Sequence, residues 1–150
     1  MGMDIRVGAY GVIVRDGAIL LSHWNEHGRS GWTLPGGGIE NGEHPATAAV
    51  REILEETGYV AELDRLLGID THIIPGRNRP GPMNRPLQAL RIVYRAHVVS
   101  GDLTDEIGGS TDEARWIPLD QIGGLHTVEL VRVGLTLNET EPPTGTYLRE

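Results

Sequence analysis

Cysteine and lysine are both missing from this 150-residue sequence. Without cysteine, the chain can form no disulfide, no thiolate zinc site and no cysteine nucleophile. Without lysine, Schiff-base and lysine-nucleophile chemistry is excluded. All 13 basic residues are therefore arginines, a choice that compositional bias is enough to explain.

Long apolar runs are missing too, since none approaches the roughly 20 residues that a membrane-spanning helix requires. The first residues, MGMDIRVGAYG, lack the basic and apolar regions of a signal peptide. We therefore expect a cytoplasmic protein without membrane contact. The net charge of -8 also opposes a role in coating nucleic acid, because that affinity depends on neutralising phosphates with basic side chains. An acidic protein that meets phosphates is expected to do so through metal ions.

Length and composition favour one domain spanning residues 1–150. The chain is long enough to bury one core, and its 39% hydrophobic and 23% charged residues are ordinary for a globular protein. It has no repeat or linker that would divide it. We expect its last residues, 139–150, to form a frayed tail.

The first third of the chain alternates between strand and loop patterns. Residues 7–14 are rich in β-branched side chains, and an Asp-Gly turn leads to a second strand at 18–21, so we predict a hairpin. The polar stretch 22–31 is expected to be a loop over a site. Residues 32–34 are expected to form a short strand.

A helix is predicted at residues 45–57. A Pro-Gly-Gly-Gly run halts regular structure before it, Pro45 suits its first turn, and Gly58 closes it. Apolar residues recur within it at helical spacing and form one stripe for packing. They are Ala46, Ala49, Val50, Ile53 and Leu54.

The rest of the chain completes an α/β pattern. Strands on both sides of a helix, with a second helix near the end, favour a mixed sheet that is covered on both faces. The long loop in this part is a candidate functional element, since long loops in compact domains often have a function. The predicted elements are strands at 61–74, 87–99 and 115–118, loops at 75–86 and 101–111, and a helix at 127–137.

Three acids on the predicted helix carry the strongest chemical signal. Glu52, Glu55 and Glu56 stand at positions i, i+3 and i+4 and share an arc of about 100°. The same arithmetic places this arc well away from the apolar stripe, so we expect the acids to face a site or solvent rather than the core. A divalent cation would relieve their mutual repulsion, and hard oxygen ligands suit Mg2+ or Mn2+. Such clusters alone are more often solvated helix faces.

Segment 37–59, GGIENGEHPATAAVREILEETGY, resembles the signature box of the Nudix hydrolase family. The box reads Gly, five residues, Glu, seven residues, then Arg-Glu-aliphatic-x-Glu-Glu-x-Gly-aliphatic. Only Tyr59 departs from it, because the family usually has an aliphatic residue there. Segments 32–36 and 115–119 resemble the family's flanking segments, and the resemblance implies the Nudix fold, an α/β/α sandwich with a central mixed sheet. The matching residues are Gly37, Glu43, Arg51, Glu52, Ile53, Glu55, Glu56 and Gly58.

The resemblance implies a Mg2+-dependent hydrolase in which a metal-activated water attacks one phosphorus of a diphosphate. By similarity, Glu52, Glu55 and Glu56 hold Mg2+, for which Mn2+ can substitute. The backbone carbonyl of Gly37 or a neighbour completes the shell. Glu52 is either a ligand or the general base, and Arg51 orients the carboxylates.

A further base is expected outside the box. In many relatives it is a glutamate in the loop before the strand predicted at 115–118. Glu106, Asp112 and Glu113 are the candidates here, and the sequence does not separate Glu106 from Glu113. Glu43 is expected to join the outer network of the box.

The residues that recognise the substrate lie outside the box. Trp24 and His23 could stack on a base or ribose, whereas Trp32 suits the core better. Pro75, 16 residues after Tyr59, resembles the mark of family members that act on ADP-ribose. The short N-terminal part instead resembles members that cleave normal or oxidised (d)NTPs. A small nucleotide-derived substrate is expected, and the choice between these two stays open.

Other functions share parts of this pattern. A nucleotide-sensing or regulatory domain of the same fold usually lacks some box acids, and this box is complete. Isopentenyl diphosphate isomerases have a similar box but need a cysteine. RNA 5′ end processing is disfavoured by the acidic charge. Because subunit pairing is common in the family, we expect a homodimer.

Overall fold

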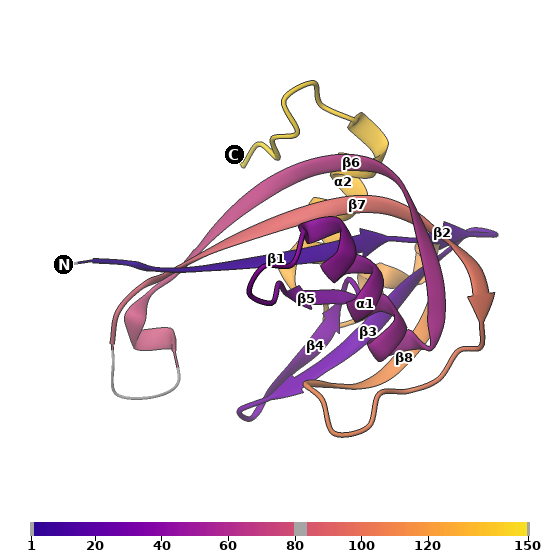
Figure 1. Cartoon of the computed structure of the whole chain (residues 1–150), viewed down its shortest axis with the longest axis horizontal. Helices are drawn as coiled ribbons and strands as arrows, with labels where there is room; N and C mark the ends of the chain where they lie inside the picture. Colours follow the sequence, from indigo (N-terminus) through magenta and orange to yellow (C-terminus); the bar gives the residue numbers. More distant parts are fainter. Residues whose placement is uncertain (1, 80–83, 150) are drawn as a thin grey trace.

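Two sheets form the framework of the molecule (Figure 1). The computed structural model describes residues 2–79 and 84–149. The first sheet has the order β5-β1-β7-β6, in which β1 and β7 run parallel and the other neighbours antiparallel. It consists of β1 (Asp4–Val12), β5 (Gly36–Gly38), β6 (Tyr59–Ile74) and β7 (Leu87–Gly101). The second sheet is antiparallel and consists of β2 (Val14–Arg15), β3 (Ala18–Glu26), β4 (Arg29–Thr33) and β8 (Thr111–Pro118).

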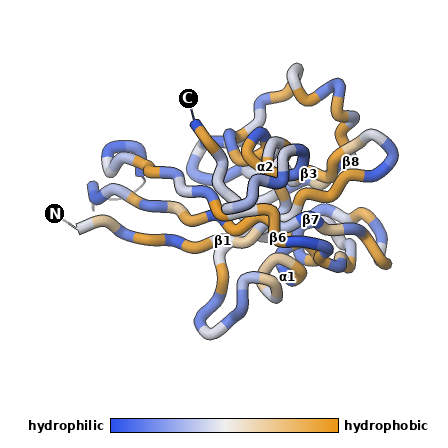
Figure 2. Tube along the Cα trace, turned by 90° about the horizontal axis from the view of Figure 1, so that it is seen from above, coloured by the Kyte–Doolittle hydropathy of each residue, from blue (hydrophilic) through white to orange (hydrophobic). Residues whose placement is uncertain are grey.

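Two α-helices cover the mixed sheet from opposite sides (Figure 2). They are α1 (Pro45–Thr57) and α2 (Glu129–Thr140), and two short 3-10 helices, η1 (Gly76–Asn78) and η2 (Leu119–Gly124), lie in the connections. The fold is thus the predicted α/β/α sandwich with a central mixed sheet. Within the described ranges, no helix is both long and apolar enough to cross a membrane.

The core lies on both faces of the mixed sheet. On the α2 side, Leu130 and Leu137 belong to one buried cluster with Val93 of β7. On the α1 side, Ile53 joins a second buried cluster with Leu20 of β3. Because α1 contacts both sheets, it is anchored between them, and any side chain at its edge faces the space that the sheets enclose.

Helix α1 has the bounds that the sequence predicted. His44 caps its N-terminus, since the His44 Nδ1 accepts a hydrogen bond of 3.0 Å from the amide of Ala46. Pro45 occupies the first turn, where its missing N–H costs no helical hydrogen bond. At the other end Gly58 adopts the left-handed conformation and its amide bonds to the carbonyl of Leu54.

The prediction of a loop at residues 22–31 is wrong, because this segment forms a hairpin. Strand β3 continues to Glu26, and β4 begins at Arg29. Both residues of the connecting turn, His27 and Gly28, have positive φ, which suits the twist of two antiparallel strands. The side chains near the turn are exposed, which explains the polar composition that suggested a loop.

The C-terminal part differs from the prediction in two ways. Helix α2 lies two to three residues later than the predicted 127–137, because Thr127 pairs with Trp32 as an isolated bridge before the helix begins. The segment 139–150 was expected to be frayed, but its described part is bound to the sheet. The amide of Ile69 in β6 donates a 2.9 Å hydrogen bond to the carbonyl of Gly145.

The predicted hairpin of residues 7–14 with 18–21 is correct only at its turn, because residues 7–12 belong to β1, which pairs with β5 and β7, and only β2 pairs with β3. Other boundaries are closer to prediction. The long loop 75–86 contains η1, and its residues 80–83 lie outside the described residues. The predicted strand at 115–118 is longer and begins at Thr111. Trp32 is 8% exposed and packs in the core, as the sequence favoured.

Ile53 provides a test of how α1 packs. Ile53→Ala is expected to lower the free energy of unfolding by about 2–5 kcal/mol, because a fully buried side chain is lost and the cavity only partly closes. Leu54 is 47% exposed, so Leu54→Ala is the matched control, with a change within about 0.5 kcal/mol. Urea denaturation followed by circular dichroism measures both. Equal losses in the two variants would contradict the packing of α1.

Candidate active site

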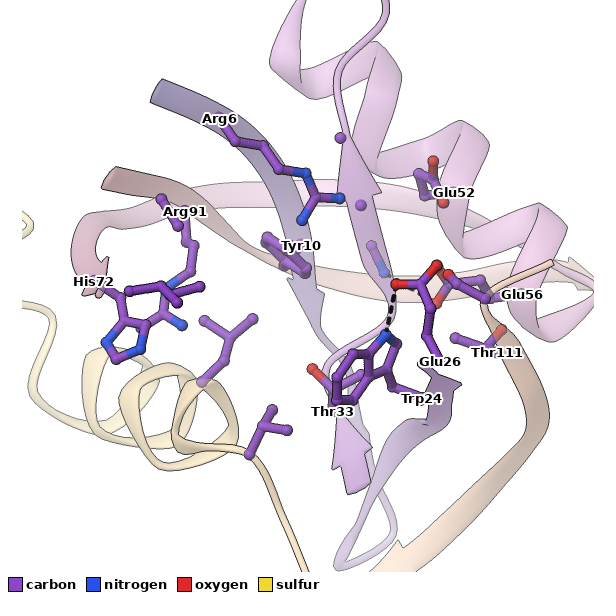
Figure 3. A pocket seen from close by; sticks show the side chains of 18 residues that line it. Arg6, Tyr10, Trp24, Glu26, Thr33, Glu52, Glu56, His72, Arg91 and Thr111 are labelled. Atoms are coloured by element: carbon purple, nitrogen blue, oxygen red, sulfur yellow. Dashed lines mark hydrogen bonds between the residues drawn. The ribbon is translucent and has the colours of Figure 1, made fainter. Parts of the chain in front are cut away.

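A pocket of about 350 Å³ opens between the two sheets and the ends of both helices (Figure 3). One end of it is acidic and is formed by Glu52 and Glu56 of α1 and Glu26 of β3. Arg91 of β7 lies at the opposite end, and the Arg6 guanidinium of β1 lies between Tyr10 and the acids, 3.5 Å from where a Cβ on Gly38 would be. The pocket therefore presents negative and positive groups at separate places. Its other lining residues are Tyr10, Trp24, Thr33, Gly36, Gly37, Gly38, His72, Ile74, Ala89, Ser110, Thr111, Val128 and Leu130.

Two glycines of β5 bring the backbone close to the acids. Gly36 has a φ of 149°, and a Cβ there would come within 2.2 Å of the carbonyl oxygen of Ala9. At Gly37 a Cβ would lie 2.9 Å from the carboxyl carbon of Glu52. Glycine is therefore required at Gly36, where the neighbour is backbone, while a side chain at Gly37 would displace the Glu52 carboxylate.

Glu56 is a buried carboxyl at the acidic end of the pocket. It is 3% exposed, and its Oε1 accepts a 3.3 Å hydrogen bond from the amide of Gly36. Burial raises the pKa of Glu56 well above its ordinary value, and the nearby Glu52 carboxyl raises it further. The acids were expected to face a site or solvent, and Glu56 does line the pocket, but its burial on the side of Ile53 was not expected. Glu56 follows Ile53 by three positions, about 60° around the helix, and shares the buried side.

Arg51 connects the acids at the outer side of the helix. Its Nε and Nη2 donate to the two carboxylate oxygens of Glu43 at 2.8 and 2.9 Å. Its Nη1 donates to Glu52 at 3.0 Å and to Glu55 at 3.3 Å. The hydrogen bond from Arg51 lowers the pKa of Glu43 to about 2, and in return Glu43 raises the pKa of Arg51. Glu43 thus joins the network around the box, where Arg51 holds Glu52 from outside.

The acidic end has the oxygen donors that a hard divalent cation binds. Glu52 and Glu56 line the pocket beside the backbone of Gly37. Among the described residues, no basic side chain forms an ion pair with the Glu56 carboxyl. Glu55 is different, because its side chain is 47% exposed and points to Arg51. In the part of the chain that the structure describes, no three His, Asp or Glu side chains converge on one point. The donor set fits a cation at Glu52 and Glu56, and Glu55 would need to turn to reach it.

The basic side chains of the pocket come from residues that the sequence did not single out. Arg6, Gly8 and Tyr10 alternate along one face of β1, and Arg91 pairs with Gly8 across the parallel strands. The ring of Tyr10 lies back over Gly8, because a Cβ on Gly8 would come within 2.8 Å of the Tyr10 hydroxyl oxygen. Figure 3 shows the Arg6 guanidinium extending into the pocket between Tyr10 and the acids. The alternation was visible in the sequence, but nothing there indicated that this face would line the pocket while the face of Ala9 packs on α1.

The predicted substrate-binding residues have three different positions. Trp24 lines the pocket, and its Nε1 donates a 3.4 Å hydrogen bond to Glu26. His23 precedes it on the strand and projects to the other face, where its Nδ1 lies 2.8 Å from Asp112. Pro75 caps η1 and does not line the pocket, although Ile74 beside it does.

The three candidate bases all lie outside the lining of the pocket. Glu113 forms an ion pair with Arg115 on the surface of β8. Asp112 accepts hydrogen bonds from Asn25 and His23, which lower its pKa. Glu106 is nearest to the site, since its Oε1 accepts a 2.7 Å hydrogen bond from the Thr111 hydroxyl, and Thr111 lines the pocket.

Comparison with known proteins agrees with this geometry. Residues 4–134 match the family model described as NUDIX domain. Two curated relatives are the CMP-5'-(N-acetyl-N-hydroxy-3-aminopropyl)phosphonate hydrolase of Streptomyces rubellomurinus, 34% identical over 71% of this chain, and the ADP-ribose pyrophosphatase of Methanocaldococcus jannaschii, 33% identical over 77%. The matches span 45% and 63% of those proteins, so the chain corresponds to only part of their length.

A solved structure also resembles the whole fold. The NUDIX hydrolase from Nitrosomonas europaea superposes with a TM-score of 0.78 at 25% identity, over 95% of this chain and 93% of its own. The family model covers both sheets and α1, including every residue of the box and both ends of the pocket. On this agreement between sequence, fold and site, the chain belongs to the Nudix family.

Proposed function

We propose that this protein is a Mg2+-dependent hydrolase that cleaves the diphosphate link between a nucleoside and a second moiety. The observation that carries the proposal is the position of the Glu52 and Glu56 carboxyls at one end of a pocket that also holds Arg6 beside them and Arg91 at the other end. If the diphosphate binds at the acidic end, the second moiety of the substrate, called the far moiety below, lies within reach of the arginines. Both curated relatives are named for substrates that contain a nucleotide, which agrees with this class.

The box residues of this chain would hold the cation and the diphosphate in place. Glu52, Glu56 and the backbone at Gly37 are the proposed ligands, with Glu55 joining after it leaves Arg51. When bound, Mg2+, or Mn2+ in its place, supplies positive charge for the diphosphate oxygens and makes an attacking water more acidic. Arg51 keeps Glu52 directed inward through its hydrogen bonds.

Substrate recognition would divide between aromatic and basic groups. Trp24 offers a flat surface for a base or ribose next to the acidic end. Ile74 and Ala89 form an apolar floor, and Arg6 and Arg91 donate hydrogen bonds to phosphate or hydroxyl oxygens of the far moiety. The named substrate of the archaeal relative favours ADP-ribose. Two arginines in the pocket favour the more highly charged (d)NTP, normal or oxidised.

A substrate panel tests the proposal directly. Purified protein with Mg2+ is incubated with ADP-ribose, normal and oxidised (d)NTPs, dinucleoside polyphosphates, nucleotide sugars and capped RNA, and the products are identified by chromatography. AMP from ADP-ribose, or pyrophosphate from a (d)NTP, is the expected product. If the protein turns over none of these compounds but still binds Mg2+, that result would support a nucleotide sensor instead.

Glu56→Gln is expected to separate metal binding from folding. Because the pKa of Glu56 is raised in the folded state, the wild type without cation loses stability as the pH rises from the ordinary carboxyl range to that pKa. An amide in place of the carboxyl cannot ionise, so the variant should not show this loss. Mg2+ at about 100 times its Kd should stabilise the wild type by about 2.7 kcal/mol and the variant much less.

Thermal melts with and without Mg2+, from pH 5 to pH 9, measure these differences. The control is Glu139→Gln, which removes one exposed acid from α2, far from the acidic end of the pocket. An equal Mg2+ response in wild type and Glu56→Gln would remove Glu56 from the proposed ligands.

Glu106 and Glu113 are expected to differ in their contribution to kcat. Glu106→Gln should lower kcat by about 100-fold or more if Glu106 is the general base. Glu113→Gln should change kcat little, because Glu113 faces Arg115 on the surface. Steady-state kinetics on the substrate found by the panel compare them. The reverse ranking would identify Glu113 as the base.

The homodimer and the cytoplasmic location stay predictions of the sequence. Light scattering coupled to size-exclusion chromatography measures the first.

A further inference from the structure

The C-terminal segment after α2, residues 141–149, returns along β6 (Figure 1). Its backbone touches the strand, because a Cβ on Gly68 would lie 2.3 Å from the carbonyl oxygen of Gly145. Farther along, the partly buried Tyr147 packs against the main core cluster. Arg149 then lies with its guanidinium carbon 5.1 Å from the centre of the Tyr147 ring. The last described residue of the chain is thereby held at the sheet.

The Arg149 guanidinium binds a buried carboxylate behind the pocket. Asp70 of β6 is 2% exposed, and its two oxygens accept hydrogen bonds of 2.7 and 2.9 Å from Arg149. The same carboxylate accepts a hydrogen bond from Arg91, its cross-strand partner in β7. Asp70 therefore connects an arginine of the tail with an arginine that lines the pocket.

Glu129, at the start of α2, completes the cluster. It accepts a hydrogen bond of 2.8 Å from Arg149 and one of 3.5 Å from Arg91. Two carboxylates and two guanidinium groups thus balance each other. Without Arg149, Asp70 and Glu129 would share Arg91, and Glu129 would keep His72 with its Nδ1 at 3.9 Å. With His72 neutral, the cluster would then carry one uncompensated negative charge next to the substrate-facing wall.

Arg91 is held from one side only. Both of its described hydrogen bonds leave from Nη2, and its buried Nε has no hydrogen-bond partner among the described residues. The described part of the chain also provides no acceptor for Nη1. Nη1 is therefore the group that can donate to a ligand, while the direction of the whole guanidinium depends on Asp70 and Glu129.

We propose that Arg149 is a positioning residue that orients Arg91 toward the substrate by holding Asp70 and Glu129. The inference rests on the proposed function, in which Arg91 binds the far moiety of the substrate. Arg149 does not line the pocket, so its effect passes through the two carboxylates. The C-terminal tail thus belongs to the substrate-binding apparatus, although it lies outside the family match at residues 4–134.

Nitrogen NMR of the arginine side chains tests the proposal without any turnover. The Nε–Hε signal of Arg91, assigned through Arg91→Lys, should be sharp and protected from exchange in the wild type, because Nε is buried. Arg149→Ala should shift and broaden this signal, and Arg149→Lys should restore part of it. The matched control is Arg132→Ala, which removes an exposed cation from α2 that has no described ion pair.

Kinetics on the substrate from the panel give the second measurement. Arg149→Ala is expected to raise KM about tenfold, the value of one charge-assisted hydrogen bond, with kcat changed less than about twofold. Arg132→Ala should leave both unchanged. A silent panel would overturn the proposed function, yet the NMR comparison would still decide whether Arg149 positions Arg91.

Two results would overturn the positioning role. One is an Arg91 signal that is the same in wild type and Arg149→Ala. The other is a fall in kcat and thermal stability without a rise in KM, which would make the tail a general support of the fold. If Arg149→Ala does not fold, the comparison of Arg149→Lys with wild type carries the same test, because lysine keeps the charge and loses the paired hydrogen bonds.

Discussion

The burial of the Glu56 carboxyl between α1 and β5 is the constraint around which the site is organised. A carboxyl that is 3% exposed needs hydrogen bonds and a nearby positive charge to remain ionised. The amide of Gly36 provides one hydrogen bond, and that contact requires a backbone which only glycine can adopt there. The helix and the glycine strand therefore depend on one another, and in the proposed function a divalent cation supplies the positive charge.

The second organising feature is the separation of charge along the pocket. Arg51 draws Glu43, Glu52 and Glu55 together at the outer side of α1, so the acids gather at one end. On the sheet, the Asp70 carboxylate accepts hydrogen bonds from both Arg91 and Arg149 and leaves one nitrogen of Arg91 available to a ligand. In both places a buried or half-buried ion pair sets the direction of a third group that faces the pocket. Orientation, rather than stability, is the main consequence of these pairs.

Errors in the sequence predictions have identifiable physical reasons. The hairpin at residues 22–31 looked like a loop, because its exposed end is polar although its two arms pair with each other and β3 also pairs with β8. The frayed tail is in fact tied to Asp70, a contact across 79 residues that no local pattern reveals. Glu56 was placed away from the core, but three residues after Ile53 it shares the buried side. Each error concerns a long-range contact or an angle that is defined by packing.

The sequence by itself determined the helix 45–57, its first-turn proline, its terminal glycine and the family, because these depend on residues that are near one another in the chain. Spacing within one helix is enough to bring Glu52 and Glu56 to the same region. The tertiary structure alone decided which acids face the pocket, that Trp24 lines it while His23 does not, and that Arg6 and Arg91 enter it from the sheet. These residues come from strands separated by many positions, and only the register of the sheets brings them together.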